Sequence, residues 1–109
     1  MTTFNAVRNL CGLSQQGTAD YLGVSIQSVK NWCRGKTAPP FGVWVMMSDL
    51  WGRVLDAGED AAERLDPENM DRMLVNGVQA DDGHDPLPDG SDWAAGAVAV
   101  LSAIQDRNL

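Results

Sequence analysis

Residues 13–40 of this chain read LSQQGTADYLGVSIQSVKNWCRGKTAPP, and this stretch decides the fold of the N-terminal half. It predicts two short helices, over residues 15–22 and 26–34, separated by a turn of three residues. Ser14 and Ser25 precede the two segments, and a serine hydroxyl at that position accepts a hydrogen bond from a free backbone N–H at the start of a helix. The pattern is typical of two helices that cross steeply.

The turn between these helices has the residues that such a crossing requires. Ala19 is small enough to let the helices touch, and Gly23 tolerates the left-handed backbone conformation that the turn needs. A second glycine, Gly35, is placed to end the second of the two helices. Apolar side chains are expected to fill the angle between the helices: Leu22, Val24, Val29 and Trp32.

Helical spacing of apolar residues extends on both sides of this stretch. Phe4, Val7, Leu10 and Cys11 predict a helix over residues 3–11. After Pro39 and Pro40, a strong apolar stripe predicts a longer helix over residues 40–57, with a short continuation over residues 59–65. The members of this stripe are Val43, Trp44, Met47, Leu50, Trp51, Val54 and Leu55.

The C-terminal part is less regular. Residues 66–80 fit either a helix or a short strand that enters a turn at Asn76 and Gly77. Residues 81–90 consist of turn-forming residues and predict a loop. A last helix is expected over residues 91–106, with Ser91 or Asp92 as its cap. We therefore expect a helix-turn-helix domain over residues 1–65 and an acidic segment over residues 66–109.

Length and composition set further bounds. A chain of 109 residues with 44% hydrophobic residues suits one compact domain, or one small domain with an appendage. No apolar run is long enough to cross a membrane, and no secretory signal is visible, so we expect a cytoplasmic protein. In that reducing compartment Cys11 and Cys33 are expected to be core thiols. No metal site and no cofactor are predicted.

The net charge of −7 is distributed unevenly. Residues 1–40 contain four basic residues and one acidic residue, whereas residues 41–109 contain four basic and fourteen acidic residues. One half of the chain can therefore approach a polyanion while the other half is repelled by it.

The motif resembles the lambda-repressor-like, Cro-type family of helix-turn-helix regulators. The resemblance covers residues 3–58 and depends on the residues quoted above together with Gln15, Gln27-Ser28 and Gly35-Lys36-Thr37. Gly17 and Thr18 depart from the family pattern and are expected to weaken the first helix of the motif. The resemblance implies a mainly α fold of four to five helices, followed here by a C-terminal helical dimerisation segment.

In that family the second helix of the motif lies in the major groove of double-stranded DNA. Outward-facing Gln27 and Asn31 suit adenine, Lys30 suits guanine or phosphate, and Ile26 is expected to be exposed and to contact a thymine methyl group. Asp20 is expected to point away from this surface. The full set of predicted DNA-binding residues is Gln15, Gln16, Ser25, Ile26, Gln27, Ser28, Lys30, Asn31, Arg34, Lys36 and Thr37.

Few basic residues are available for contact with DNA, so a homodimer bound to an inverted repeat is expected. Two apolar surfaces are candidates for its interface, one on the helix at residues 40–57 and one on the helix at residues 91–106. The predicted dimerisation residues are Trp51, Trp93, Ala97, Val100, Leu101 and Ile104. Ordinary packing of the last helix within its own chain is the alternative.

These observations predict a DNA-binding transcriptional regulator, most simply a repressor, and no enzyme. In layout the chain is similar to some small repressors of phages and mobile elements, including those associated with anti-CRISPR operons. Two alternatives remain open: an antitoxin whose acidic half binds a toxin, and a protein-interaction module on the same scaffold. His84 lies in the acidic loop and is interpreted as a solvent-exposed residue.

Overall fold

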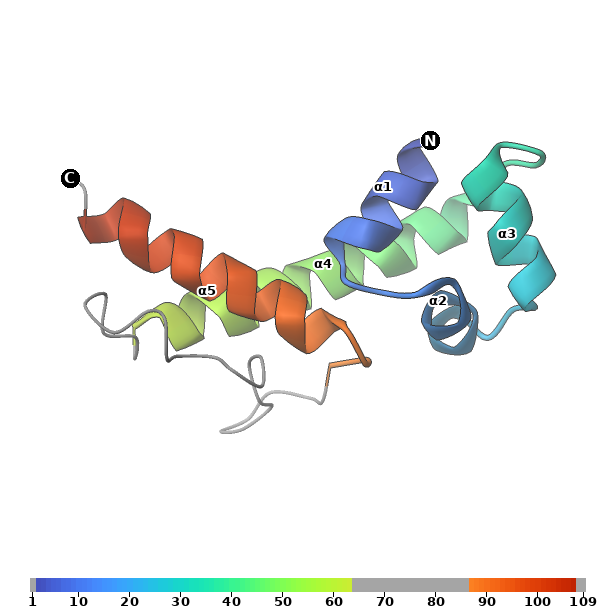
Figure 1. Cartoon of the computed structure of the whole chain (residues 1–109). Coiled ribbons are helices and arrows are strands. Elements are labelled where there is room, and N and C mark those ends of the chain that lie inside the picture. The colour runs from blue at the N-terminus through green and yellow to red at the C-terminus, as the bar shows by residue number, and fades with distance from the viewer. Residues whose placement is uncertain (1, 64–86, 108–109) are drawn as a thin grey trace.

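The computed structural model describes residues 2–63 and 87–107, and in these ranges all regular secondary structure is α-helix, as Figure 1 shows. The predicted mainly α class is confirmed. The molecule is elongated, with extents of 45 × 27 × 21 Å. The helices in chain order are α1 (Thr3–Leu10), α2 (Gln15–Leu22), α3 (Ile26–Arg34), α4 (Phe41–Ala62) and α5 (Ser91–Arg107).

Local capping explains why α2 and α3 begin and end where the sequence predicts. The Ser14 hydroxyl accepts a hydrogen bond from Gly17 N–H at 2.9 Å, and the Ser25 hydroxyl accepts one from Ser28 N–H at 3.2 Å. Gly23 ends α2 with a φ of +70°, in the left-handed region that glycine adopts without strain. These contacts satisfy backbone groups that the helices themselves leave without partners.

The two unusual residues of α2 have a structural explanation. A Cβ atom at Gly17 would lie only 3.1 Å from the Ser14 hydroxyl, so the glycine leaves room for the capping group. Thr18 is fully buried, and its hydroxyl donates a hydrogen bond to the Ser14 carbonyl at 2.8 Å. Both residues therefore support the start of α2.

Aromatic packing joins α1 to α3 and α4. The Phe4 ring is almost fully buried and meets the rings of Trp32 and Trp44 edge to face, with centroid distances of 5.5 and 5.7 Å. Edge-to-face pairs of this kind stabilise the fold by more than the burial of their apolar surface alone. Cys11 and Cys33 are buried in the same core, so the prediction that they are core thiols is confirmed.

The predicted end of the fourth helix is wrong. Helix α4 runs without interruption through Gly58 to Ala62, where the sequence suggested an end near Ala57 and a separate continuation. The reason is tertiary, because α5 packs very closely on this part of α4. A Cβ atom at Gly58 would lie 2.6 Å from Val98 and 2.8 Å from the Ala95 carbonyl. The glycine is therefore a contact residue between helices and does not break α4.

More of the apolar stripe of α4 is buried within the chain than the sequence suggested. Met47 is completely buried in the core, so it is not available for a second molecule. Trp44 and Trp51 are half-buried and pack against that core, and Leu55 is half-buried. The expected surplus of apolar surface at these positions is therefore largely covered by the chain itself.

Three predictions lie wholly or mostly outside the described residues. These are the helix or strand over residues 66–80, the position of His84 and the loop over residues 81–90. Among the helices that the structure describes, none combines the length and the hydropathy needed to cross a bilayer.

Candidate nucleic-acid interface

Helix α3 lies at one end of the elongated molecule and has one buried face and one outer face (Figure 1). Val29, Trp32 and Cys33 form the buried face. On the outer side Gln27 and Arg34 are exposed and Lys30 and Asn31 are half-buried, as the helical spacing predicts. We call these four residues the reading face.

Ile26 differs from its prediction. It is half-buried and packs against the hydrophobic core, whereas the sequence suggested an exposed side chain at the tip of the helix. It is the first residue of α3 and follows the turn that joins α2 to α3, where the core closes. Packing against the core therefore accounts for an apolar residue at this position, and contact with a thymine methyl group is not needed to explain it.

The two amide side chains of the reading face are joined to each other. The Gln27 Nε2 atom donates a hydrogen bond to the Asn31 Oδ1 atom at 3.1 Å, across one turn of α3. The bond leaves the Gln27 carbonyl oxygen as an acceptor and the Asn31 amino group as a donor. Amide acceptors and donors are the groups that pair with the N6 amino group and the N7 atom of adenine in the major groove.

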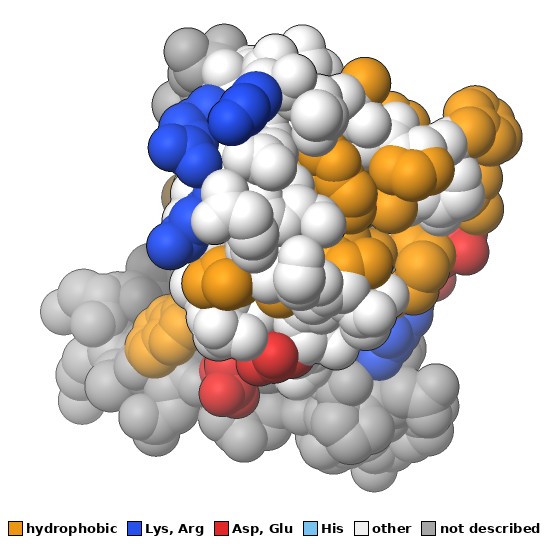
Figure 2. Space-filling view, turned by 90° about the vertical axis from the view of Figure 1, so that its right-hand side faces the viewer, with side chains coloured by type: hydrophobic (Ala, Val, Ile, Leu, Met, Phe, Trp, Pro, Cys, Tyr) orange, Lys and Arg blue, Asp and Glu red, His pale blue; other side chains and the backbone are white. Residues whose placement is uncertain are grey.

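Basic side chains lie around the same helix. Lys30 and Arg34 are on α3, and Lys36 follows in the exposed segment after Gly35. Figure 2, which looks at this end of the molecule, shows most of its basic side chains along one edge. The Arg34 Nε atom donates to the Lys30 carbonyl at 3.4 Å, which anchors that guanidinium at the end of α3. A surface of this kind attracts phosphate.

Arg8 contributes to the positive charge of residues 1–40 but not to this surface. Its guanidinium donates from Nε and Nη2 to the Asn5 Oδ1 atom and from Nη1 to the Leu13 carbonyl at 2.6 Å. These bonds hold the end of α1 to the start of the α2 segment. Arg8 is therefore structural, and three basic residues remain around α3.

At the start of α2, the structure separates the two predicted glutamines. Gln15 is half-buried, while Gln16 is exposed and its Nε2 atom donates to Asp20 Oδ1 at 2.9 Å. Asp20 was expected to point away from the DNA-binding surface, but it lies on the same side of α2 as Gln16. A carboxylate here repels phosphate, so Asp20 weakens any contact of Gln16 with a phosphate group.

The remaining predicted DNA-binding residues lie at the two ends of α3. The hydroxyls of Ser25 and Ser28 lie 3.0 Å apart at its start, where the Ser25 hydroxyl caps the helix, and Thr37 is exposed after its end. A helix start with small hydroxyl side chains leaves space for a phosphate group to approach.

Comparison with protein families gives one informative match. Residues 5–50, which contain most of α1, all of α2 and α3 and the first part of α4, match a family model described as helix-turn-helix. This part of the chain has a lambda-repressor-like helix-turn-helix fold. The match indicates a DNA-binding regulator. Comparisons with curated proteins and with solved structures gave no match.

Outside the helix-turn-helix, the predicted dimerisation residues of α5 lie together. Trp93, Ala97, Leu101 and Ile104 are exposed, and Val100 is half-buried. Trp93 is 53% exposed and Leu101 is 61% exposed. The opposite side of α5, formed by Ala95, Ala99 and Ala103, is buried. Helix α5 thus packs on its own chain with small residues and leaves its large apolar residues outside.

Sequence reasoning missed a second exposed apolar group, which lies at the start of α4. Phe41 is 81% exposed, and Val45 and Met46 are also exposed. Hydrophobic side chains also gather in the part of Figure 2 opposite the basic edge. The signal was present in the sequence, because these three residues fall outside the stripe that begins at Val43.

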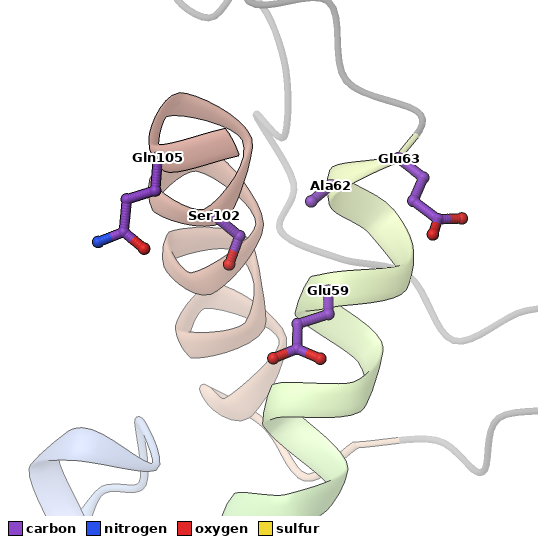
Figure 3. Close-up of a pocket in the computed structure, with 5 residues that line it drawn as sticks. All are labelled: Glu59, Ala62, Glu63, Ser102 and Gln105. Carbon is purple, nitrogen blue, oxygen red and sulfur yellow. The ribbon is translucent and has the colours of Figure 1, made fainter. Parts of the chain in front are cut away.

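The other end of the molecule is acidic. A cavity of about 360 Å³ lies between the C-terminal parts of α4 and α5, and Figure 3 shows Glu59 between the two helices. Its lining residues are Glu59, Ala62, Glu63, Ser102 and Gln105. Within residues 2–63 and 87–107, no three His, Cys, Asp or Glu side chains are placed to hold a metal ion.

Proposed function

We propose that this protein is a sequence-specific transcriptional regulator that inserts α3 into the major groove of double-stranded DNA. The observation that carries the proposal is the reading face of α3, where a linked pair of amides is exposed beside basic residues. The amides supply base recognition and the basic residues supply phosphate contacts. The helix-turn-helix match over residues 5–50 supports the same role.

The proposal includes a homodimer bound to an inverted repeat. Three basic residues around α3 neutralise few phosphates, and a twofold dimer doubles that number. The exposed apolar residues of α5, from Trp93 to Ile104, supply a self-complementary surface of the kind that twofold dimers use. We further propose that the dimer represses a nearby promoter, its own included, and that it acts in the cytoplasm. An origin in a phage or mobile element stays a prediction.

Selection of bound sequences from random DNA duplexes tests this proposal. We expect the selected sequences to contain an inverted repeat with half-site centres about 34 Å apart, which is one turn of DNA. Selected sequences that share no motif, or that contain only a single half-site, would contradict the dimeric regulator.

The double substitution Gln27→Ala and Asn31→Ala tests the assignment of the reading face. We expect the preference for the selected operator over unrelated DNA to fall by at least about tenfold, because one bidentate contact contributes 1–3 kcal/mol of discrimination. Fluorescence anisotropy, repeated at two salt concentrations, measures the affinity for the operator and the affinity for unrelated DNA.

Gln105→Ala is the matched control for these substitutions. It truncates an exposed amide on α5, at the other end of the molecule, and we expect operator preference to stay at the wild-type value. If the double variant retained its full preference, another surface would have to read the DNA.

One observation favours a second candidate function, which is that of an antitoxin. The acidic cavity between α4 and α5 lies away from α3 and suits a basic partner protein. In that case a toxin encoded beside this protein would co-purify with it, and Glu59→Gln with Glu63→Gln would weaken the complex. A protein-interaction module without DNA binding is the remaining alternative, and it predicts no operator.

A further inference from the structure

The start of α5 is joined to the turn between α1 and α2 by a buried hydrogen bond. Ser91 is fully buried, and its hydroxyl donates to the Cys11 carbonyl at 2.6 Å. The sequence suggested that Ser91 or Asp92 caps α5. The Asp92 carboxylate accepts hydrogen bonds from the N–H groups of Gly90 and Trp93, so the Ser91 hydroxyl is left for the distant contact.

Two glycines make this contact close. The backbones of Gly12 and Gly90 touch, and a Cβ atom on either residue would collide with the carbonyl oxygen of the other. Both glycines also have a left-handed backbone, with φ values of +79° and +95°. A glycine is therefore needed at each position for two reasons, and the contact has little freedom to slide.

The contact links the two parts of the molecule that a dimeric regulator must align. Gly12 lies just before Ser14, which caps α2, and α2 packs on α3. At its other end, Gly90 precedes α5, whose outer side carries Trp93 and Leu101. A second close contact, between Gly58 and Val98, holds α5 to α4. Two separate contacts along α5 suppress rotation of this helix relative to the reading face.

We propose that the contact of Gly12 with Gly90 and Ser91 sets the separation of the two α3 helices in the homodimer, and with it the preferred spacing of the operator half-sites. This inference rests on the proposed function. The half-site spacing of a helix-turn-helix dimer follows from the distance between its reading helices. A rigid connection between α5 and the helix-turn-helix therefore selects one spacing, and a loose connection accepts several. Ser91 is a positioning residue in this scheme, because it does not touch DNA.

The experiment measures the affinity of the full chain for a set of duplexes. Each duplex carries the selected half-sites, with their separation changed by one base pair at a time. We expect the wild-type protein to bind one spacing at least tenfold more tightly than spacings that differ by two base pairs. Ser91→Ala removes the hydrogen bond without adding volume, and we expect the ratio between spacings to fall at least threefold.

Two further variants complete the design. Gly90→Ala forces the two backbones apart and is expected to flatten the spacing profile further. Ser102→Ala truncates a half-buried serine on the same helix, away from the turn, and is expected to keep the wild-type profile. A general loss of stability lowers the affinity at all spacings alike, so the ratio between spacings separates positioning from folding.

Sedimentation of the same samples gives their oligomeric state, which separates a failure of this inference from a failure of the proposed function. If Ser91→Ala remains a dimer and keeps the wild-type spacing ratio, the inference is wrong and the proposed function stands. If the wild-type protein binds as a monomer, or binds all spacings equally, the dimeric regulator and this inference both fail.

Discussion

A single hydroxyl group near the N-terminus holds both α1 and α3. The Thr2 Oγ1 atom accepts a hydrogen bond from Asn5 N–H at 3.2 Å, which caps α1. The single proton of the same hydroxyl is shared between the carbonyls of Cys33 at 2.9 Å and Trp32 at 3.2 Å, at the end of α3. The position of the reading helix thus depends in part on the second residue of the chain.

Replacement of Thr2 by valine tests this role. The side chain keeps its shape but loses the hydroxyl, and we expect the free energy of unfolding to fall by about 1–2 kcal/mol, the cost of a lost cap together with unpaired backbone groups. Urea denaturation followed by circular dichroism measures the change. Thr2→Ser keeps the hydroxyl and is expected to stay close to the wild type, so equal losses in both variants would contradict the argument.

A second prediction at this scale concerns pH. Burial raises the pKa of the Cys11 thiol above its ordinary value of 9.0. The folded state therefore holds this proton more tightly than the unfolded state does. The contribution of this thiol to the free energy of unfolding is fully present below pH 9 and is lost as the pH rises above that value.

Denaturation at pH 8 and pH 10 in a reducing buffer measures this effect. We expect the stability of the wild type to fall between the two values, and Cys11→Ala to show a smaller fall, although it is less stable at both because it leaves a cavity. An identical fall in the two proteins would assign the pH dependence to other groups.

At the scale of helices, the pairing of α4 with α5 depends on small residues. Ala57, Gly58 and Ala61 on α4 and Ala95 and Ala99 on α5 are all buried, and Gly58 lies against the Ala95 carbonyl. Small side chains let two helix backbones approach closely, and a larger group at the point of contact forces them apart.

Two glycines of α4 offer a matched comparison. Gly58 is in tight contact with α5, whereas a Cβ atom at Gly52 would meet open space. We expect Gly52→Ala to stabilise the protein by roughly 0.5–1 kcal/mol, because alanine favours the helix. Gly58→Ala gains the same helix propensity but collides with Val98, and we expect a net destabilisation of about 1–3 kcal/mol.

Thermal and urea unfolding of the two variants test the comparison. If both substitutions stabilised the protein, the close approach of α5 to α4 at Gly58 would be wrong. The result concerns the pairing of α4 with α5 and not DNA recognition, since neither glycine is part of the reading face.

At the scale of the whole molecule, charge is separated along the long axis. Lys30, Arg34 and Lys36 lie around α3, and Glu59 and Glu63 lie at the other end of α4. A protein with a net charge of −7 can approach DNA with the first end only. The acidic end is then directed away from the phosphate backbone, which gives the encounter one preferred orientation.

The salt dependence of DNA binding checks this view. Three basic residues in each protomer make up to about six phosphate contacts in the dimer, so log K should fall with log salt with a slope of about −5. We expect Lys36→Ala to reduce the slope by about 2, since two contacts are lost, and to weaken binding to all sequences similarly. A slope unchanged by this substitution would remove Lys36 from the interface.

Local interactions allowed much of the first half of the molecule to be predicted. Helices α2 and α3 begin after Ser14 and Ser25 as expected, because a cap and its N–H partner lie within three residues of each other. The buried face of α3 was likewise predictable from its periodicity, and so was the outward position of Gln27 and Asn31. The division of the chain near residue 65 stays a prediction.

Contacts between distant residues decided the rest. Met47 is core because α4 is covered by the chain itself, Gly58 is a contact residue because α5 packs closely on it, and Arg8 is bonded to the Leu13 carbonyl. Ser91 bonds to Cys11 across 80 positions of sequence, a pairing that no local pattern encodes. Periodicity and capping depend on neighbours along the chain and can be read from it. Which faces meet depends on how whole helices pack, and only the tertiary structure contains that information.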